Sequence, residues 1–127
     1  MIQAIGVDIV EIRRIKRAVQ RWGDRFLNKI LTPHEHDYCL HPRLKVHSIA
    51  ARFAAKEALF KSLPPQLQPI VGWQDLEVVN DAAGRPHFRG LGRWKQLFAE
   101  YNVQLSISHS LDSAVAVVAF EEKGEKS

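Results

Sequence analysis

The segment ARFAAKEALFKSL, residues 51–63, constrains the fold of this chain more than any other stretch. Its alanines and large apolar residues leave no polar face, which predicts a helix that is packed on several sides. Ser48 is a candidate N-cap, and Pro64 ends the helix after Leu63. The alanines predict close contact with another element. Four charged residues nevertheless interrupt the apolar pattern, namely Arg52, Lys56, Glu57 and Lys61.

These four charges have two explanations. In the first, Glu57 and Lys61 form an ordinary pair at the helix edge, worth about 0.2–0.5 kcal/mol. Arg52 and Lys56 then extend along the apolar surface toward water. In the second, Glu57 binds a metal ion and the cations contact phosphate, because charged groups are rarely buried without a partner or an ion. The helix by itself does not decide between them.

Residues 2–10, IQAIGVDIV, alternate between large and small side chains, which predicts a strand. The small residues would form an open face, on which Asp8 has space for a ligand; Asp8 could instead cap the next helix. With Glu57, Asp8 would supply two carboxylates, a set that suits Mg²⁺. The large side chains would form the packed face, and they are Ile5, Val7 and Ile9.

Residues 11–22 change to a helical period, with an apolar stripe that includes Ile15 and Trp22. Five basic residues lie on the opposite face against one acidic residue, so this segment holds the whole net charge of +4. The pattern predicts an acidic partner. A nucleic acid is one alternative, but no aromatic residues interleave the basic face. The basic residues are Arg13, Arg14, Lys16, Arg17 and Arg21.

The remaining motifs predict short elements joined by turns. TPHE at 32–35 is a capping box before a helix to about Leu40. The order of elements predicts an α+β fold with a largely antiparallel sheet, in a single domain over residues 1–127. The further elements expected are strands at 70–80 and 87–89, a helix at 91–101, and a hairpin of strands 103–108 and 113–120.

The composition predicts a cytoplasmic protein that is not embedded in a membrane. No run approaches the roughly 18 apolar residues of a membrane span, and the first residues lack the basic start of a signal peptide. Cys39 is the single cysteine, so no internal disulfide can form.

Taken together, the motifs resemble those of the holo-[acyl-carrier-protein] synthases, the small bacterial 4′-phosphopantetheinyl transferases. The resemblance implies the fold of that family and a homotrimer with active sites between subunits. It implies transfer of 4′-phosphopantetheine from coenzyme A to a serine of apo acyl carrier protein, in fatty acid biosynthesis, with release of adenosine 3′,5′-bisphosphate. The matching segments are GVDIVEI (6–12), LTPHE (31–35), ARFAAKEALFKSL (51–63), WQDLEVVNDAAGRP (73–86) and LSISHSLDSAVAVV (105–118).

The resemblance also implies roles for individual residues. Asp8 and Glu57 would bind Mg²⁺, which holds the pyrophosphate of coenzyme A, and Lys61 would offset phosphate charge. The general base is left open between Glu57 and a water on the metal. SISHS (106–110) would face the metal site of a neighbouring subunit. Other candidate contacts to coenzyme A are Arg52, Lys56, Gly84, Arg85, Pro86 and His109, although DAAGRP (81–86) is most simply a turn and His109 a surface residue.

The basic face would dock an acidic helix of the carrier protein, through Arg13, Arg14, Arg17 and Arg21. One departure concerns the loop after the central helix, where the family usually has a glycine-containing loop and this chain has LPPQLQP (63–69). Its effect on the coenzyme A pocket and on carrier preference is left open. Two other classes remain as alternatives, a basic nucleic-acid-binding domain and a structural trimer without activity.

Overall fold

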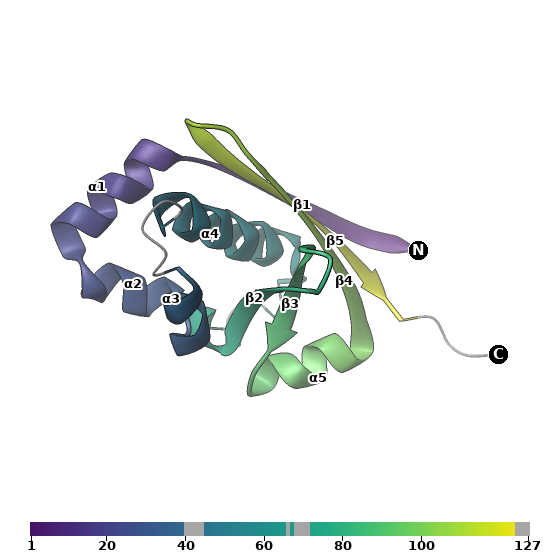
Figure 1. Cartoon of the computed structure of the whole chain (residues 1–127). Helices are drawn as coiled ribbons and strands as arrows, with labels where there is room; N and C mark the ends of the chain where they lie inside the picture. Colours follow the sequence, from purple (N-terminus) through teal and green to yellow (C-terminus); the bar gives the residue numbers. More distant parts are fainter. Residues whose placement is uncertain (40–44, 66, 68–71, 124–127) are drawn as a thin grey trace.

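The computed structural model describes residues 1–39, 45–65, 67 and 72–123, and it confirms the expected α+β class with antiparallel strands (Figure 1). The strands are divided between two sheets, a division that the sequence pattern did not predict. The first sheet has the order β1-β5-β4, and the second pairs β2 with β3. The strands are β1 (Ile2–Glu11), β2 (Leu76–Asn80), β3 (Pro86–Gly90), β4 (Tyr101–His109) and β5 (Ser113–Glu122).

The helices follow most of the predicted boundaries. Gly23, at φ 53°, separates the first two helices. The capping box between Thr32 and Glu35 is present, with Glu35 N donating to Thr32 Oγ1 and Thr32 N to Glu35 Oε1. Ser48 lies inside its helix, so its assignment as N-cap was wrong. The helices are α1 (Ile12–Trp22), α2 (Asp24–Ile30), α3 (Pro33–Tyr38), α4 (Lys45–Ser62), α5 (Arg93–Glu100) and a short 3₁₀ helix η2 (Trp73–Asp75).

Helix α4 packs closely against one face of the three-stranded sheet (Figure 1). A Cβ atom built on Gly6 of β1 would lie 1.9 Å from the carbonyl oxygen of Ala58. Ala54 and Ala58 are fully buried at this contact. The predicted close approach of the alanine-rich helix is therefore confirmed.

The predicted orientation of β1 was wrong. Gly6 and Val10 are buried on the side of α4, whereas Ile5, Val7 and Ile9 are 64%, 54% and 68% exposed. The reason is steric, because the helix backbone approaches so closely that only the small-residue face of β1 can lie beneath it.

Part of the predicted loop and strand around residues 63–80 lies outside the described residues, at 66 and 68–71. The consequence of the LPPQLQP departure therefore stays a prediction. The described strand begins at Leu76, after η2. Within the described part of the chain, none of the helices combines the length and hydrophobicity that crossing a lipid bilayer requires.

Candidate active site

Asp8 of β1 and Glu57 of α4 come together with Lys61, as the second explanation of the helix charges requires. Lys61 Nζ donates to Asp8 Oδ1 over 2.8 Å. Burial raises the pKa of the Glu57 carboxyl above its ordinary value, and the nearby charge of Asp8 raises it further. The charge of Asp8 thus acts on Glu57, although 49 positions separate the two residues in the sequence.

The simpler alternatives for these residues do not describe the whole cluster. Helix α1 follows Glu11 as its N-cap, and no side chain of the described residues caps it, so Asp8 does not serve that role. The hydrogen bonds of Lys61 go to Asp8 and to the Val7 carbonyl oxygen on the sheet, while its charge also lowers the pKa of Glu57, one turn earlier on its own helix. The cluster therefore joins two elements and is not a pair at the edge of one helix.

The two carboxylates fit a magnesium ion in their chemistry. Hard oxygen donors suit Mg²⁺, which typically takes one or two protein carboxylates and completes its shell with water and phosphate. A divalent cation would relieve the repulsion that raises the pKa of Glu57. Among the described residues, no group of three His, Cys, Asp or Glu side chains is placed to hold a metal ion. A two-carboxylate site would therefore complete the shell of the ion with water or with phosphate oxygens.

A second part of the predicted site is a pocket of about 250 Å³ on the other side of α4. Its lining residues come from three distant segments, which are the first half of α4, the β2–β3 hairpin with its turn, and the end of β4. Gly84 has φ 84°, which confirms its predicted turn conformation. Arg85 lies in a neighbouring cavity that shares two lining residues with the first. The predicted coenzyme A contacts that line the pocket are Arg52, Gly84, Pro86 and His109.

His47 also lines this pocket, and the sequence analysis missed it. Its ring centroid is 5.7 Å from that of His109. The predicted helix began after Ser48 and so left His47 outside it. The helical register from Lys45 was the missing signal, because it places His47 one turn before Ala51 on the same pocket wall.

Lys56 is placed differently from the other predicted contacts to coenzyme A. It is 1% exposed, and its Nζ donates to Ile30 O at 2.6 Å, Glu35 Oε1 at 2.5 Å and Trp73 O at 3.1 Å. Burial lowers the pKa of Lys56, while Glu35 acts to raise it. The expectation that Lys56 extends along the apolar surface toward water was wrong, because its ammonium group is hydrogen-bonded in the interior. This position offers no support for a contact with coenzyme A.

The sheet register explains why the carboxylate cluster and the pocket are separate within one chain. Asp8, Ala116 and Ile107 form one row across β1, β5 and β4. Neighbouring strands lie about 4.8 Å apart, so Asp8 and the β4 edge are roughly 10 Å apart. Ile107 and His109 line the pocket at that edge. The described residues that line the pocket do not include Asp8, Glu57 or Lys61.

The basic face of α1 is exposed as predicted. Arg14 is close enough for its charge to lower the pKa of Glu57, which places this face beside the carboxylates. Trp22, expected on the apolar stripe, is 49% exposed, and the Arg21 guanidinium lies 5.0 Å from its ring centre. Trp22 also lines a surface hollow of about 220 Å³ with Arg25, Phe26 and Lys29.

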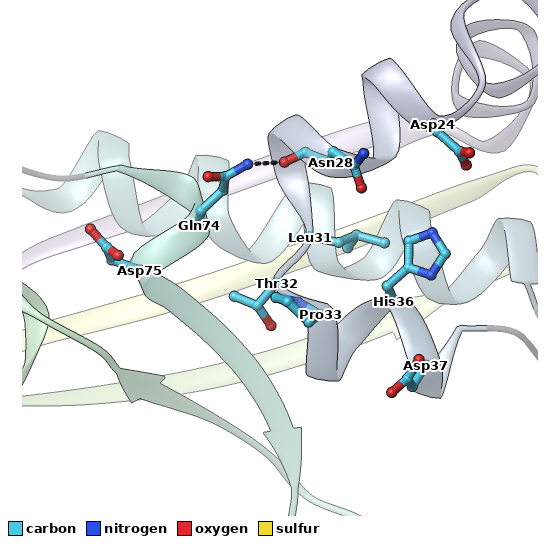
Figure 2. Close-up of a pocket in the computed structure, with 9 residues that line it drawn as sticks. All are labelled: Asp24, Asn28, Leu31, Thr32, Pro33, His36, Asp37, Gln74 and Asp75. Atoms are coloured by element: carbon cyan, nitrogen blue, oxygen red, sulfur yellow. Dashed lines mark hydrogen bonds between the residues drawn. The ribbon is translucent and has the colours of Figure 1, made fainter.

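A larger cavity, of about 620 Å³, lies between α2, α3 and η2, away from all the predicted site residues. Figure 2 shows the Gln74 amide donating to the carbonyl oxygen of Asn28 across it. Three of its lining residues are Asp24, Asp37 and Asp75. Their negative charge does not suit a ligand that carries phosphate groups.

Comparison with known proteins places the chain among relatives along nearly its whole length. The family model for the 4′-phosphopantetheinyl transferase superfamily matches residues 4–119. A holo-[acyl-carrier-protein] synthase from Halothermothrix orenii is 43% identical, with 96% of this chain and 99% of that protein covered. One from Chlorobium chlorochromatii is 44% identical, with 92% and 98% covered.

Solved structures agree with these relatives. A holo-(acyl-carrier-protein) synthase from Bacillus anthracis in complex with CoA (3′,5′-ADP) has a TM-score of 0.80 at 37% identity, covering 97% of this chain and 99% of that one. The Neisseria meningitidis synthase has a TM-score of 0.80 at 32% identity, with 96% and 100% covered. The Helicobacter pylori synthase in complex with coenzyme A has a TM-score of 0.76 at 30% identity, with 92% and 99% covered.

Proposed function

This chain belongs to the 4′-phosphopantetheinyl transferase superfamily, and from this premise we propose how it acts as a holo-[acyl-carrier-protein] synthase. Residues 1–127 form one transferase domain that works in the cytoplasm. Its reaction transfers 4′-phosphopantetheine from coenzyme A to a serine of apo acyl carrier protein. The observation that carries the assignment to this chain is the meeting of Asp8 and Glu57 across β1 and α4.

Asp8 and Glu57 are the residues that would hold Mg²⁺. When bound, the ion supplies Lewis-acid stabilisation of charge on the pyrophosphate of coenzyme A. Lys61 contributes a second positive charge beside Asp8, and its hydrogen bond to Asp8 raises its pKa, so that it stays protonated at neutral pH. In the transfer, the serine oxygen bonds to the β-phosphorus while the bond to the departing bisphosphate breaks. Lys61 is placed to offset the negative charge that develops there.

The pocket lined by Arg52, Gly84, Pro86 and His109 would receive coenzyme A. The guanidinium of Arg52 supplies a positive charge at its wall, and the turn at Gly84 brings backbone close to the opening. Relatives crystallised with coenzyme A support this use of the fold. Arg85, in the neighbouring cavity, is a further candidate for a phosphate contact.

A homotrimer would join the two parts of the site. The sheet face opposite α4 exposes Ile5, Val7 and Ile9, together with Val117, which pairs with Val7. A contiguous apolar face of this kind typically marks a protein–protein contact. Since Asp8 and His109 lie at opposite edges of the sheet, a neighbouring subunit could present its pocket to the carboxylates of this one.

Replacing Ile9 by aspartate is expected to dissociate the trimer, because it places a charge in the apolar face. Sedimentation velocity should show a shift from trimer to monomer, with loss of transfer activity. Gln96→Asp, at an exposed site on α5, is the matched control and should stay trimeric. An unchanged mass for Ile9→Asp, or a monomeric wild-type protein that is fully active, would contradict the proposal.

The basic face of α1 would dock the carrier protein, with Arg14 closest to the carboxylates. Exposed charge pairs are screened over about 10 Å at 0.1 M salt. Raising the salt from roughly 0.05 M to 0.2 M is therefore expected to raise the KM for the carrier protein several-fold more than the KM for coenzyme A. Arg17→Glu should mimic this effect at low salt. Equal salt dependence of the two KM values would count against the docking face.

Mass spectrometry of the carrier protein tests the activity itself. The protein is incubated with coenzyme A, Mg²⁺ and an apo carrier protein, and the carrier should gain the mass of one phosphopantetheinyl group. A chelator control without Mg²⁺ should show no gain. If several apo carriers remain unmodified, a nucleic-acid-binding domain or an inactive trimer becomes the better assignment.

A further inference from the structure

Glu35 is a fully buried carboxylate that accepts hydrogen bonds at the start of α3, from α4 and from β2. Its Oε1 accepts from Thr32 N at 3.0 Å, within the capping box of α3, and from Lys56 Nζ of α4 at 2.5 Å. Its Oε2 accepts from Val78 N of β2 at 2.8 Å. A capping glutamate needs only the first of these bonds, so the other contacts indicate an additional role.

The second oxygen of Glu35 faces the wall of the coenzyme A pocket. Arg52 Nε lies 3.8 Å from Oε2, and Arg52 Nη1 donates to Ser48 O at 3.3 Å. Both Arg52 and Val78 line the pocket, one from α4 and the other from β2. One carboxylate oxygen thus contacts two of the elements between which the pocket lies.

Glu35 lies between two buried cations at this wall. Lys56 and Arg52 are two buried cations against the one carboxylate of Glu35. The nearby Glu77 has its own partners, because its oxygens accept from Thr32 Oγ1 and from Arg89. Glu35 is therefore a carboxylate partner that Lys56 and Arg52 share, and a change at Glu35 would reach Arg52 through this contact.

We propose that Glu35 is a positioning residue for coenzyme A binding, which sets the orientation of the Arg52 guanidinium and its distance from β2. This inference rests on the proposed use of the pocket. Glu35 touches neither substrate nor metal and acts through Arg52. Its expected signature is a change in the KM for coenzyme A that depends on Arg52.

A double-mutant cycle between Glu35 and Arg52 tests the proposal. Glu35→Gln is expected to raise the KM for coenzyme A by about tenfold, with kcat and the KM for the carrier protein changed by less than about twofold. Arg52→Gln should raise the same KM. In the Arg52→Gln background, adding Glu35→Gln should change it by less than about twofold. A purely structural role would instead give independent, multiplicative effects, and that result would overturn the inference.

Two further variants keep the test interpretable if Glu35→Gln folds poorly. Glu35→Gln/Lys56→Met removes both members of the buried pair, a change that is often tolerated; it should fold and still show the raised KM. Glu77→Gln alters another buried carboxylate that is not among the pocket residues, and should leave the KM within about twofold of wild type. A wild-type KM in the first variant, or an equal rise in the second, overturns the inference.

The failure of the proposed function looks different from failure of this inference. If Arg52→Gln leaves the KM for coenzyme A unchanged, the pocket assignment is wrong, and the positioning role is overturned with it. If Arg52→Gln raises that KM but the effects of the two substitutions multiply, the pocket assignment stands and only the role of Glu35 is overturned.

Discussion

Replacing Asp8 or Glu57 by alanine is expected to lower kcat/KM for transfer by about a thousandfold or more, without unfolding the protein. The loss follows because each variant lacks one of the two carboxylates proposed to hold Mg²⁺. Asp8 stabilises the fold only modestly, since its partner Lys61 is 55% exposed and such a pair is worth about 0–1 kcal/mol.

Glu57 should be dispensable for stability for a further reason. Its pKa is raised in the folded state, so the folded protein binds this proton more tightly than the unfolded chain does. The stabilising contribution is present below the unfolded pKa and is lost as the pH rises through the folded pKa. At neutral pH, Glu57→Gln should therefore be at least as stable as the wild type without Mg²⁺, although it is inactive.

Thermal unfolding with and without Mg²⁺ separates the two effects. Mg²⁺ should raise the Tm of the wild type, because binding to the folded state stabilises it, and should leave the Tm of either variant unchanged. Glu100→Ala removes an exposed carboxylate on α5 and is the matched control. Wild-type turnover by Asp8→Ala or Glu57→Ala would exclude the two-carboxylate metal site.

Local sequence patterns predicted most of the elements and marked Asp8 and Glu57 as a possible carboxylate pair. The capping box at Thr32 and the hairpin of β4 and β5 are both present. Asp8 and Glu57 meet because the small residues of β1 face the alanines of α4, and both patterns were visible in the sequence. What these patterns could not specify was which face of β1 the helix covers, since alternation defines two faces without showing what covers each.

Contacts between distant segments explain the other features of the structure that the sequence patterns did not predict. The partner of Lys56 is Glu35, 21 positions earlier, and local periodicity carries no information about such a pair. The capping box explains the side chain of Glu35 by itself, so local pattern pointed to no second role for this residue. Similarly, the pocket requires Arg52, Gly84 and His109 to converge from separate elements. The family resemblance indicated these three residues as candidate contacts, but that they line one pocket is visible only in the folded structure.

Gly6→Ala is expected to cause the largest loss of stability among single substitutions near the site. The added Cβ would lie 1.9 Å from the carbonyl oxygen of Ala58 and 2.9 Å from its carbonyl carbon, which are backbone atoms of α4 that no rotamer change can move. Strand and helix must separate, at a cost of about 1–3 kcal/mol or more. Denaturant titration should show a lower midpoint with a similar slope.

The same substitution should impair transfer even in molecules that remain folded. Asp8 lies two residues after Gly6 and Glu57 one residue before Ala58, so separating the two backbones separates the two carboxylates. Gly72→Ala is the control, because the nearest atom to a Cβ there is 4.0 Å away and its φ of −118° is ordinary. Its stability should stay within about 0.5 kcal/mol of wild type. If Gly6→Ala matched this control in stability and activity, close packing of β1 on α4 could not be what holds Asp8 beside Glu57.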